Sequence, residues 1–174
     1  MRLPFFGSRP SRVYTLSHDT GTADHVPPPS PPPHLRELID VVGVGHTETV
    51  NGVSLTLLSL ERYREGHLAL FRLHRARGRL ELEFPSPHLD LAVMPEGADP
   101  YRFWMMGGSG GGDMRETEYR QSYAIVPAPP SDASETVIEV RAISWKRYSS
   151  SGTYKVVAVD TGPWRFSIRL RATE

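Results

Sequence analysis

Apolar and polar side chains alternate at every second position through much of this 174-residue chain, and this alternation constrains its fold more than any other feature. Because successive side chains of a β-strand point to opposite faces, the alternation predicts strands with one buried and one solvent-exposed face. The last such segment shows it most clearly, with an expected inward row of Trp164, Phe166, Ile168 and Leu170 and an outward row of Arg165, Ser167, Arg169 and Arg171.

Earlier segments repeat the pattern and supply further inward rows. These rows are Leu80, Leu82 and Phe84; Leu89, Leu91 and Val93; Thr117, Tyr119, Tyr123 and Ile125; and Thr136, Ile138, Val140 and Ala142. About eight or nine strands of this kind, separated by proline and glycine, favour an all-β fold with antiparallel strands. We therefore predict a β-sandwich, in which two sheets bury their apolar faces against each other.

A two-residue turn predicts the first hairpin. Asn51-Gly52 separates Gly45–Val50 from Val53–Leu57. Asn-Gly is the strongest short signal for a hairpin, because both central residues of the favoured turn adopt positive φ. Asn51 is also the only asparagine of the chain, which makes this position stand out.

A second hairpin is expected where Arg64-Glu65-Gly66 separates Ser54–Tyr63 from His67–His74. The alternative is a helix from about Leu60 to Arg77, because apolar residues there also recur at helical spacing. Gly66 would cost such a helix about 1 kcal/mol relative to alanine. We therefore prefer the two strands.

The chain divides into a tail and one domain. Residues 1–34 are polar or proline-rich, and Pro27–Pro33 contains six prolines, which disfavour both helices and sheet interiors. We expect residues 1–34 to form a flexible tail and residues 35–174 to form the β-sandwich domain. Leu35–Ile39, directly after the prolines, predicts a short helix.

The composition excludes several kinds of chemistry. Without cysteine there are no disulfides, thiolate zinc sites or cysteine nucleophiles. The formal net charge of 0 gives no global attraction to nucleic acid, so a nucleic-acid partner is not expected. No apolar stretch approaches the roughly 18 residues of a membrane span, and Gly7 ends the apolar start before a signal peptide could form. We expect a cytoplasmic protein with no cofactor and no resident metal.

The glycine-rich segment Met106–Asp113 does not match a phosphate-binding loop. Such a loop needs a lysine and a serine or threonine after its last glycine, whereas Asp113 and Met114 follow here. The dinucleotide-binding spacing of glycines is also missing. We predict a flexible loop that joins a strand at Tyr101–Met106 to one at Met114–Val126.

Histidines and carboxylates at alternate strand positions give weaker hypotheses. His46 with Glu48, and His88 with Asp90, would each share a strand face and could offer nitrogen and oxygen ligands to a metal. Solvated strand side chains are the simpler interpretation. Glu116 and Glu118 could form an acid–base pair, but Arg120 on the same face favours a solvated surface.

Arginines provide the most concentrated chemistry. Arginine guanidinium groups beside aromatic rings suit the recognition of phosphate or carboxylate groups. Cross-strand ion pairs with acidic residues are the ordinary alternative. Lys146, Arg147 and Tyr148 are expected in a loop after Trp145. The candidate contacts for an anion or a partner are Arg165, Arg169, Arg171 and Arg141 on the outer face, with Arg115 and Trp104 beside the glycine segment.

Three segments carry a resemblance to a known group of domains. They are Asn51–Leu57, Tyr63 with Gly66, and Gly162–Ile168. Through them, residues 44–171 resemble bacterial immunoglobulin-like β-sandwich domains of unknown function, as found in the extracytoplasmic parts of anti-sigma-factor-like proteins and lipoproteins. The resemblance implies an immunoglobulin-like fold and brings no active site with it, because its residues are turn and core residues.

No catalytic set emerges, so we expect a non-catalytic domain that interacts with a partner protein or serves as an accessory domain. Exposed strand edges able to pair with another chain would serve that role. Two alternatives remain. The first is a small-ligand or anion-binding domain that uses Gly107–Gly112 and the arginine-rich face. The second is an enzyme of unrecognised type that uses Asp113, Glu116 and Glu118.

Overall fold

The computed structural model describes residues 31–76, 85–94, 100–112, 116–129, 135–150 and 153–169. These residues form eight antiparallel strands and no helix, so none of them belongs to a helix that could cross a membrane. The strands are β1 (Leu38–Val50), β2 (Val53–Tyr63), β3 (His67–Ala76), β4 (Ser86–Met94), β5 (Arg102–Gly112), β6 (Glu116–Val126), β7 (Thr136–Tyr148) and β8 (Tyr154–Ile168).

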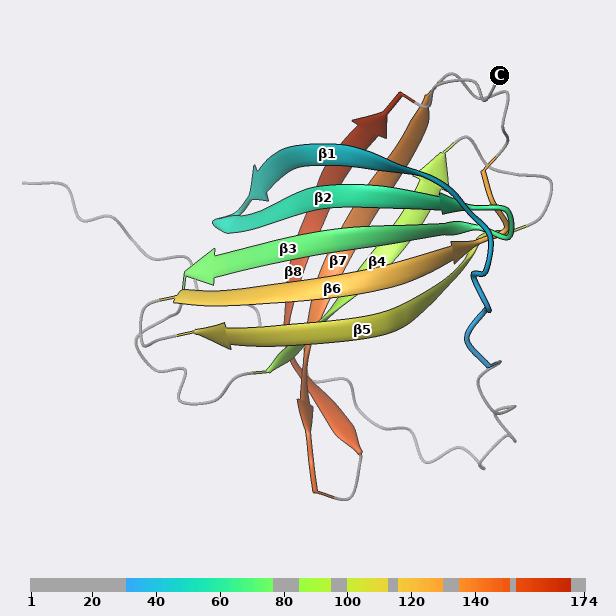
Figure 1. Ribbon diagram of the computed structural model, residues 1–174. Helices are drawn as coiled ribbons and strands as arrows, with labels where there is room; N and C mark the ends of the chain where they lie inside the picture. Colours follow the sequence, from blue (N-terminus) through green and yellow to red (C-terminus); the bar gives the residue numbers. More distant parts are fainter. Residues whose placement is uncertain are drawn as a thin grey trace, which may run out of the picture.

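The strands form two layers, which confirms the predicted β-sandwich. One sheet has the order β1-β2-β3-β6-β5, and the other has the order β4-β7-β8. In Figure 1 the five-stranded sheet lies in front, with β1 at its upper and β5 at its lower edge, and the other sheet crosses behind it. The hairpin of β7 and β8 continues beyond the edge formed by β5.

The core lies between the sheets and uses the inward rows expected from the alternation. Trp164, Phe166 and Ile168 are buried on β8, while Arg165 and Arg169 are exposed. Phe166 packs against Phe71 of the facing sheet, with ring centroids 5.9 Å apart. The largest fully buried side chains are Trp145, Trp164, Phe71, Phe166, Leu55, Leu57, Leu60, Ile125, Ile138 and Ile143.

The Asn51–Gly52 turn is present as predicted. Asn51 has φ 51° and Gly52 has φ 81°, the positive values that the turn requires. The turn also attaches one side of the sandwich to β8, because Asn51 Nδ2 donates a hydrogen bond to Thr161 O (3.4 Å). Trp164 Nε1 donates a second one to Val53 O (3.1 Å). These bonds close the side of the sandwich that holds β1, β2 and β8.

The predicted second hairpin is confirmed, and the predicted short helix is wrong. β2 and β3 pair from Val53↔Arg75 to Arg62↔His67, so strands occupy the described part of the alternative helix at Leu60–Arg77. The short helix at Leu35–Ile39 is absent because β1 already begins at Leu38 and pairs with β2. A segment of five residues is too short to be stable as an isolated helix, so strand pairing determines its conformation.

One inward row ends earlier than expected. Ala142 is only partly buried, and Ile143 and Trp145 occupy the inward positions instead. The pairing of β7 with β4 shifts between Asp90↔Ala142 and Leu91↔Val140. The bulge at this shift reverses the side on which later residues point.

Some expectations concern residues outside the described ranges. These are most of the 1–34 tail, the strand Arg79–Phe84, and Leu170 and Arg171 at the end of the last strand.

A charged and titratable cluster is buried at the end of β2 and β3. Arg62 and His67 are opposite each other and both buried, and Arg62 Nη1 donates to Asp40 Oδ2 (3.2 Å). Neither ring nitrogen of His67 has a hydrogen-bond partner among the described residues. Burial, and then the charge of Arg62, lower the pKa of His67 to about 4.

We predict that this histidine makes stability depend on pH. The pKa of His67 is lower in the folded than in the unfolded chain, so its full contribution to the free energy of unfolding is present above about pH 6.5. As the pH falls towards 4, the free energy of unfolding decreases by up to about 3 kcal/mol, because the unfolded chain binds the proton more readily. Urea unfolding from pH 7 to pH 4 should show a smaller loss of stability in His67→Leu than in the wild type. His34→Leu, at an exposed position, should behave like the wild type, and equal pH dependence in all three chains would contradict the prediction.

Candidate functional site

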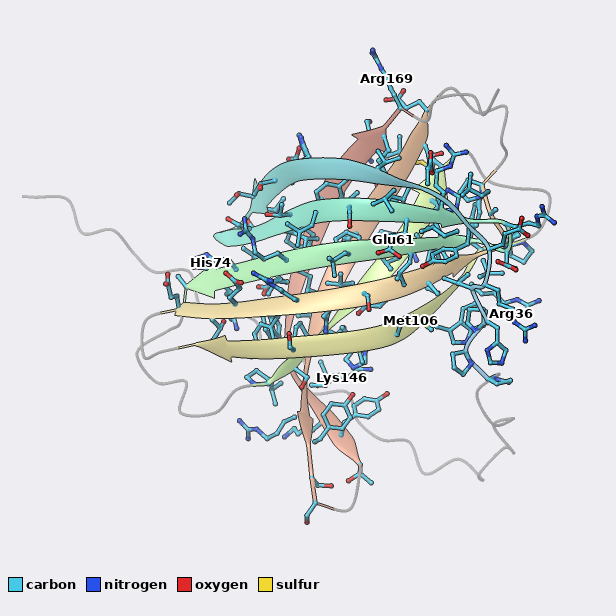
Figure 2. All side chains as sticks on the ribbon, in the orientation of Figure 1. Arg36, Glu61, His74, Met106, Lys146 and Arg169 are labelled. Atoms are coloured by element: carbon cyan, nitrogen blue, oxygen red, sulfur yellow. The ribbon has the colours of Figure 1, made fainter. Side chains whose placement is uncertain are left out.

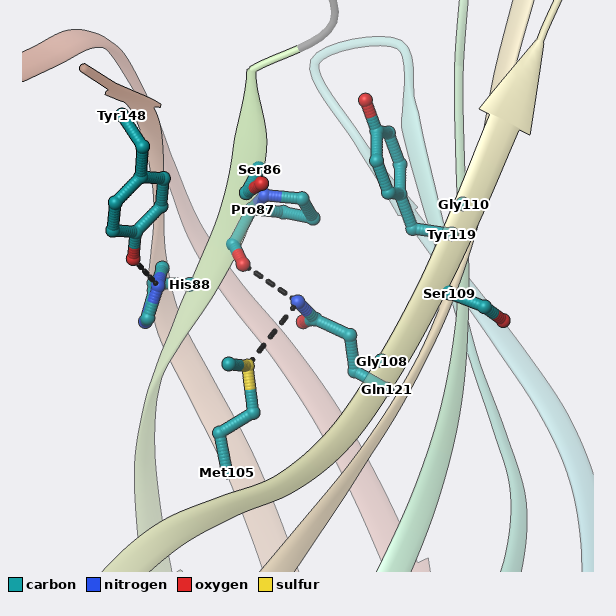
Figure 3. A pocket seen from close by; sticks show the side chains of 10 residues that line it. All are labelled: Ser86, Pro87, His88, Met105, Gly108, Ser109, Gly110, Tyr119, Gln121 and Tyr148. Carbon is teal, nitrogen blue, oxygen red and sulfur yellow. Dashed lines mark hydrogen bonds between the residues drawn. The ribbon is translucent and has the colours of Figure 1, made fainter. Parts of the chain in front are cut away.

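A cavity of about 360 Å³ lies where the edge of one sheet faces the edge of the other. It lies between β4 and β5 (Figure 3), which are the edge strands opposite β8 and β1 in their sheets. Side chains or backbone of β4, β5, β6 and β7 surround it. The lining residues are Ser86, Pro87, His88, Met105, Gly108, Ser109, Gly110, Tyr119, Gln121 and Tyr148.

The glycine segment forms one wall of this cavity and is a strand, so the predicted loop at Gly107–Gly112 is wrong. Its residues belong to β5 and pair with β6 from Gly107↔Ser122 to Gly112↔Thr117. The regular ladder along β6 supplies backbone partners that the glycine-rich composition did not reveal. Only the connection after Gly112 remains outside the described residues.

Three glycines of β5 face the interior of the sandwich. Gly108, Gly110 and Gly112 pair with Gln121, Tyr119 and Thr117, three of the buried residues of β6. Paired residues of an antiparallel ladder share a face, so the inner face of β5 carries no side chain over these positions. Beyond the Met105 side chain, β5 therefore contributes backbone rather than inward side chains to this wall of the cavity.

Only some of these glycines are required by the packing of the chain itself. A Cβ atom on Gly110 would overlap the ring of Tyr119, so this position must stay glycine. A Cβ atom on Gly108 would meet its nearest neighbours, Arg120 O and Gln121 Cγ, at an ordinary 3.5 Å. A Cβ atom on Gly111, which points to the outer face, would meet nothing within 4 Å. Among the described residues, packing therefore gives no steric reason for glycine at Gly108 or Gly111.

Side chains of β6 satisfy the backbone of the facing edge strand β4. Gln121 Nε2 donates to Pro87 O (2.6 Å), as Figure 3 shows. Tyr119 Oη donates to Pro85 O (2.9 Å), and Leu89 N donates to Tyr123 Oη (3.0 Å). Burial raises the pKa of Tyr123 to about 12, so its hydroxyl stays neutral. The outward backbone groups of β4 are thus occupied along Pro85–Leu89.

The polar groups at the mouth of the cavity are neutral hydrogen-bonding groups. His88 Nε2 lies 2.8 Å from Tyr148 Oη, and their rings are tilted against each other. Burial lowers the pKa of His88, and the nearby charge of Lys146 lowers it further. A neutral imidazole, a phenol and an amide can bind hydrogen-bonding groups of a ligand, and the ten residues that line the cavity include no carboxylate.

The β7–β8 hairpin continues from the mouth of the cavity. Lys146, Arg147 and Tyr148 belong to strand β7, so their predicted position in a loop is wrong. Tyr148 pairs with Tyr154 across the hairpin, and both rings are about half exposed. Lys146 Nζ lies 4.2 Å from the centroid of the Tyr154 ring. Aromatic rings and positive charge thus stand beside the cavity.

The arginines proposed from the sequence do not line the cavity. Arg165 forms an ion pair with Glu139, and Arg141 forms one with Asp90 at 2.7 Å, which is the cross-strand pairing considered as the alternative. Arg169 lies at the far end of β8, away from Lys146 (Figure 2). Arg115 and Arg171 fall outside the described residues.

Trp104, the remaining candidate, lies on β5 and is partly buried. It pairs with Ala124, whereas the next residue, Met105, pairs with the inward-facing Tyr123. Trp104 therefore faces away from the cavity, on the outer side of the five-stranded sheet.

The paired histidines and carboxylates have local partners. His46 Nε2 lies 2.6 Å from Glu48 Oε1, and His88 and Asp90 bind Tyr148 and Arg141 rather than each other. The described residues contain no group of three or more side chains suited to hold a metal ion. Glu116 pairs with His74 at 2.9 Å, and Glu118 pairs with Arg120 at 3.5 Å.

Gln121 is the cavity residue that the sequence analysis missed. The inward row expected for its strand contained Tyr119 and Tyr123 but omitted the polar residue between them. The alternation itself places Gln121 on that face, and it is the only glutamine of the chain. A buried amide between two tyrosines was the available signal, because a buried polar group needs a hydrogen-bond partner.

Comparisons with known proteins add information on the fold. No family model and no curated protein matches the chain. The chain is similar to a solved structure, described as the crystal structure of the conserved domain protein from Bacillus anthracis, with a TM-score of 0.54 and 14% identity. The match covers 76% of this chain and 49% of that one, so this chain spans about half the length of its structural neighbour. At this identity the similarity concerns the fold alone.

We predict opposite effects of two alanine substitutions on the inner face of β5. Gly108→Ala should raise the free energy of unfolding by about 0.4–1 kcal/mol, because alanine restricts the unfolded chain and fits the native strand. Gly110→Ala should lower it by about 1–3 kcal/mol, because the new methyl group overlaps the Tyr119 ring. Urea unfolding of both variants measures the difference. Equal stability of the two variants would show that the wall of the cavity is packed differently.

Proposed function

We propose that this protein is a non-catalytic binding domain that takes up an extended segment of a partner protein along the free edge of β5. The observation that carries the proposal is the glycine wall. Gly108, which faces the cavity, is glycine although the Cβ atom of alanine would fit there. The edge is exposed from Met105 to Gly112, and Phe103–Gly112 contains no charged residue.

An edge of this kind supports strand addition. The outer backbone groups of an edge strand can pair with another chain, and proteins ordinarily block such edges with lysine, proline, bulges or covering segments. On the open side of this sandwich, β6 side chains bind the backbone of β4 along Pro85–Leu89. Within the described part of the chain, β5 pairs with β6 alone. Glycine there lets a second backbone approach closely.

The cavity supports recognition of a side chain of the added segment. Side chains of a strand paired with β5 would point alternately to the outer face and into the space between the sheets. The inward ones would meet the cavity beneath Gly108 and Gly110. Its volume of about 360 Å³ lies at the small end of the roughly 300–1,000 Å³ of ligand pockets. Main-chain hydrogen bonds would give affinity, and the cavity would give specificity.

A single extended segment suits this edge better than a second copy of the domain. The β7–β8 hairpin continues past β5 on the side where the new strand would lie (Figure 1). A whole sheet that approached this edge would meet the hairpin, whereas one strand can lie beside it. The immunoglobulin-like resemblance and its anti-sigma context stay predictions, and pairing along β5 does not depend on them.

Selection of displayed peptides tests the proposal. The full chain is used to enrich peptides from a random library, and the affinity of enriched peptides is then measured with two leucine variants. Gly108→Leu should weaken binding at least about tenfold, because its side chain enters the cavity and obstructs the inward-facing residue. Gly111→Leu is the matched control on the outer face of the same strand and should keep more of the affinity.

The outcomes separate this mode from others. Peptides that bind Gly108→Leu as well as the wild type, or a library that yields no binder, would contradict strand addition at β5. Concentration-dependent dimerisation of the wild type that Gly108→Leu abolishes would assign the edge to a second copy instead. Circular dichroism of both variants verifies that the strands are retained.

A further inference from the structure

The edge of β5 has no cover among the described residues, although it has the properties of an edge that proteins protect. Within the described ranges β5 pairs with β6 alone. The strand has no charged residue from Phe103 to Gly112, and the large apolar side chains of Met105 and Met106 are exposed on it. Such an edge is a template for aggregation, and a covering segment is one ordinary protection. A segment of the chain itself could cover the edge while no partner is bound.

The start of the chain contains one sequence suited to pair with a strand edge. Residues 1–30 lie outside the described ranges. Ser11–Thr20 is their longest stretch without proline or glycine, and it is about as long as β5. It contains Val13–Thr15, three consecutive residues of types that are enriched in strands. Tyr14 and Leu16 are two positions apart, so in a strand they would point to the same face.

The directions of the strands suit an antiparallel addition of this segment. Neighbours in the order β1-β2-β3-β6-β5 are all antiparallel. β1 and β5 therefore begin at the same end of the sheet, which is the right-hand end in Figure 1. A segment antiparallel to β5 would finish at that end, where the chain has to enter β1. The connection would cross the width of the sheet without returning along its length.

The connection is long enough for this path. A strand added to β5 would lie five interstrand spacings from β1, which is about 24 Å. Residues 17–37 connect Leu16 to β1, and a chain of this length reaches about 70 Å when fully extended. Pro27–Pro33 within it favours polyproline II, which rises about 3.1 Å per residue and so covers about 22 Å. The proline-rich stretch thus has the length of a spacer across the sheet.

The described part of the connection takes this direction. Arg36 N donates a hydrogen bond to Glu65 Oε2 (3.3 Å). Arg64 N donates to Glu37 O (3.0 Å), and the side chains of these two residues form an ion pair at 2.8 Å. These contacts hold the stretch before β1 at the β2–β3 turn. In Figure 1, residues 31–37 leave β1 at the right and run past the strand ends towards the side of β5.

We propose that Ser11–Thr20 pairs with the free edge of β5 in the same molecule and places Tyr14 in the cavity, so that the chain blocks its own binding site until a partner displaces the segment. This inference rests on the proposed function, because it specifies how access to the same edge is regulated. The cavity has room for the ring, since roughly 150 Å³ accommodates benzene and the cavity measures about 360 Å³. The Tyr14 hydroxyl can form hydrogen bonds with neutral groups such as His88 at the mouth.

The tether makes a weak contact sufficient for such a block. A short flexible linker keeps a segment at an effective concentration of the order of millimolar. A segment with a Kd of about 1 mM as a free peptide would therefore occupy the edge about half of the time. A partner that binds with a Kd of about 1 μM can still displace it. The block would thus be reversible.

Amide hydrogen exchange of the full chain tests the pairing directly. After correction for intrinsic rates, amides of Ser11–Thr20 should exchange at least about twofold more slowly in the wild type than in the double variant Tyr14→Ser with Leu16→Ser. Gly108→Leu, which fills the cavity, should also speed their exchange. The double variant Leu3→Ser with Phe5→Ser is the matched control outside the segment and should behave like the wild type. Equal exchange in all four chains would overturn the inference.

Binding of the enriched peptides gives a second readout. They should bind the Tyr14→Ser, Leu16→Ser variant at least about twofold more tightly than the wild type, because the edge is no longer occupied. The Leu3→Ser, Phe5→Ser variant should match the wild type. A synthetic peptide with the sequence of Ser11–Thr20 should bind the first variant, and adding Gly108→Leu to that variant should weaken the binding.

Failure of this inference differs from failure of the proposed function. Peptides that depend on Gly108 but bind the wild type and the Tyr14→Ser, Leu16→Ser variant equally would overturn the block and leave strand addition in place. Slow exchange of Ser11–Thr20 that Gly108→Leu abolishes, with no peptide enriched even by that variant, would overturn the partner and support the pairing. Slow exchange that ignores Gly108→Leu would overturn the pairing with β5. Slow exchange that depends on protein concentration would assign the segment to a second copy and overturn pairing within one molecule.

Discussion

Hydrogen bonds between side chains on the inner face of β6 and the backbone of β4 determine which edge strand of this sandwich has its backbone groups occupied. Tyr119, Gln121 and Tyr123 occupy alternate positions of β6 and bind three successive outward backbone groups between Pro85 and Leu89. A buried backbone group without a partner costs about 1–3 kcal/mol. These side chains therefore join the two sheets and occupy the edge of β4 along Pro85–Leu89, while the edge of β5 has no equivalent cover from the described residues.

The two sides of the sandwich are held together by different means. On the side of β1 and β8, large apolar groups fill the interior and the Trp164 indole bonds to Val53 O. On the side of β4 and β5, glycines remove side chains from one wall, and polar groups from β6 span the remaining gap. Glycine inside a strand costs about 0.5–1 kcal/mol relative to alanine. Retaining it at Gly108, where a Cβ atom would fit, maintains an opening at a cost in stability.

The sequence pattern predicted many of the core residues, but it did not predict the cavity between β4 and β5. The alternation placed Leu89, Leu91 and Val93 inward, and their burial confirms it. The glycine segment was mistaken for a loop because glycine has a weak intrinsic preference for strands. It forms a strand because it pairs with β6, whose residues alternate between buried and exposed positions. Ala142 was misplaced because a bulge depends on how two strands meet, which the period-two pattern of one strand cannot show. Arg141, Arg165 and Arg169 are exposed as expected, and carboxylates of neighbouring strands pair with Arg141 and Arg165.

The sequence alone determined the class of fold, because a period of two leaves only strands able to separate apolar from polar groups, and it determined the first hairpin, because Asn51 and Gly52 accept positive φ. It also fixed the charge of the β7–β8 stretch, which is a property of composition. Only the tertiary structure decided that Gly108 faces a cavity, that Gln121 seals β4, and that the charged hairpin stands beside β5. Each of these depends on the relation of segments distant in sequence, and side-chain order within one strand contains no information on which strand lies opposite.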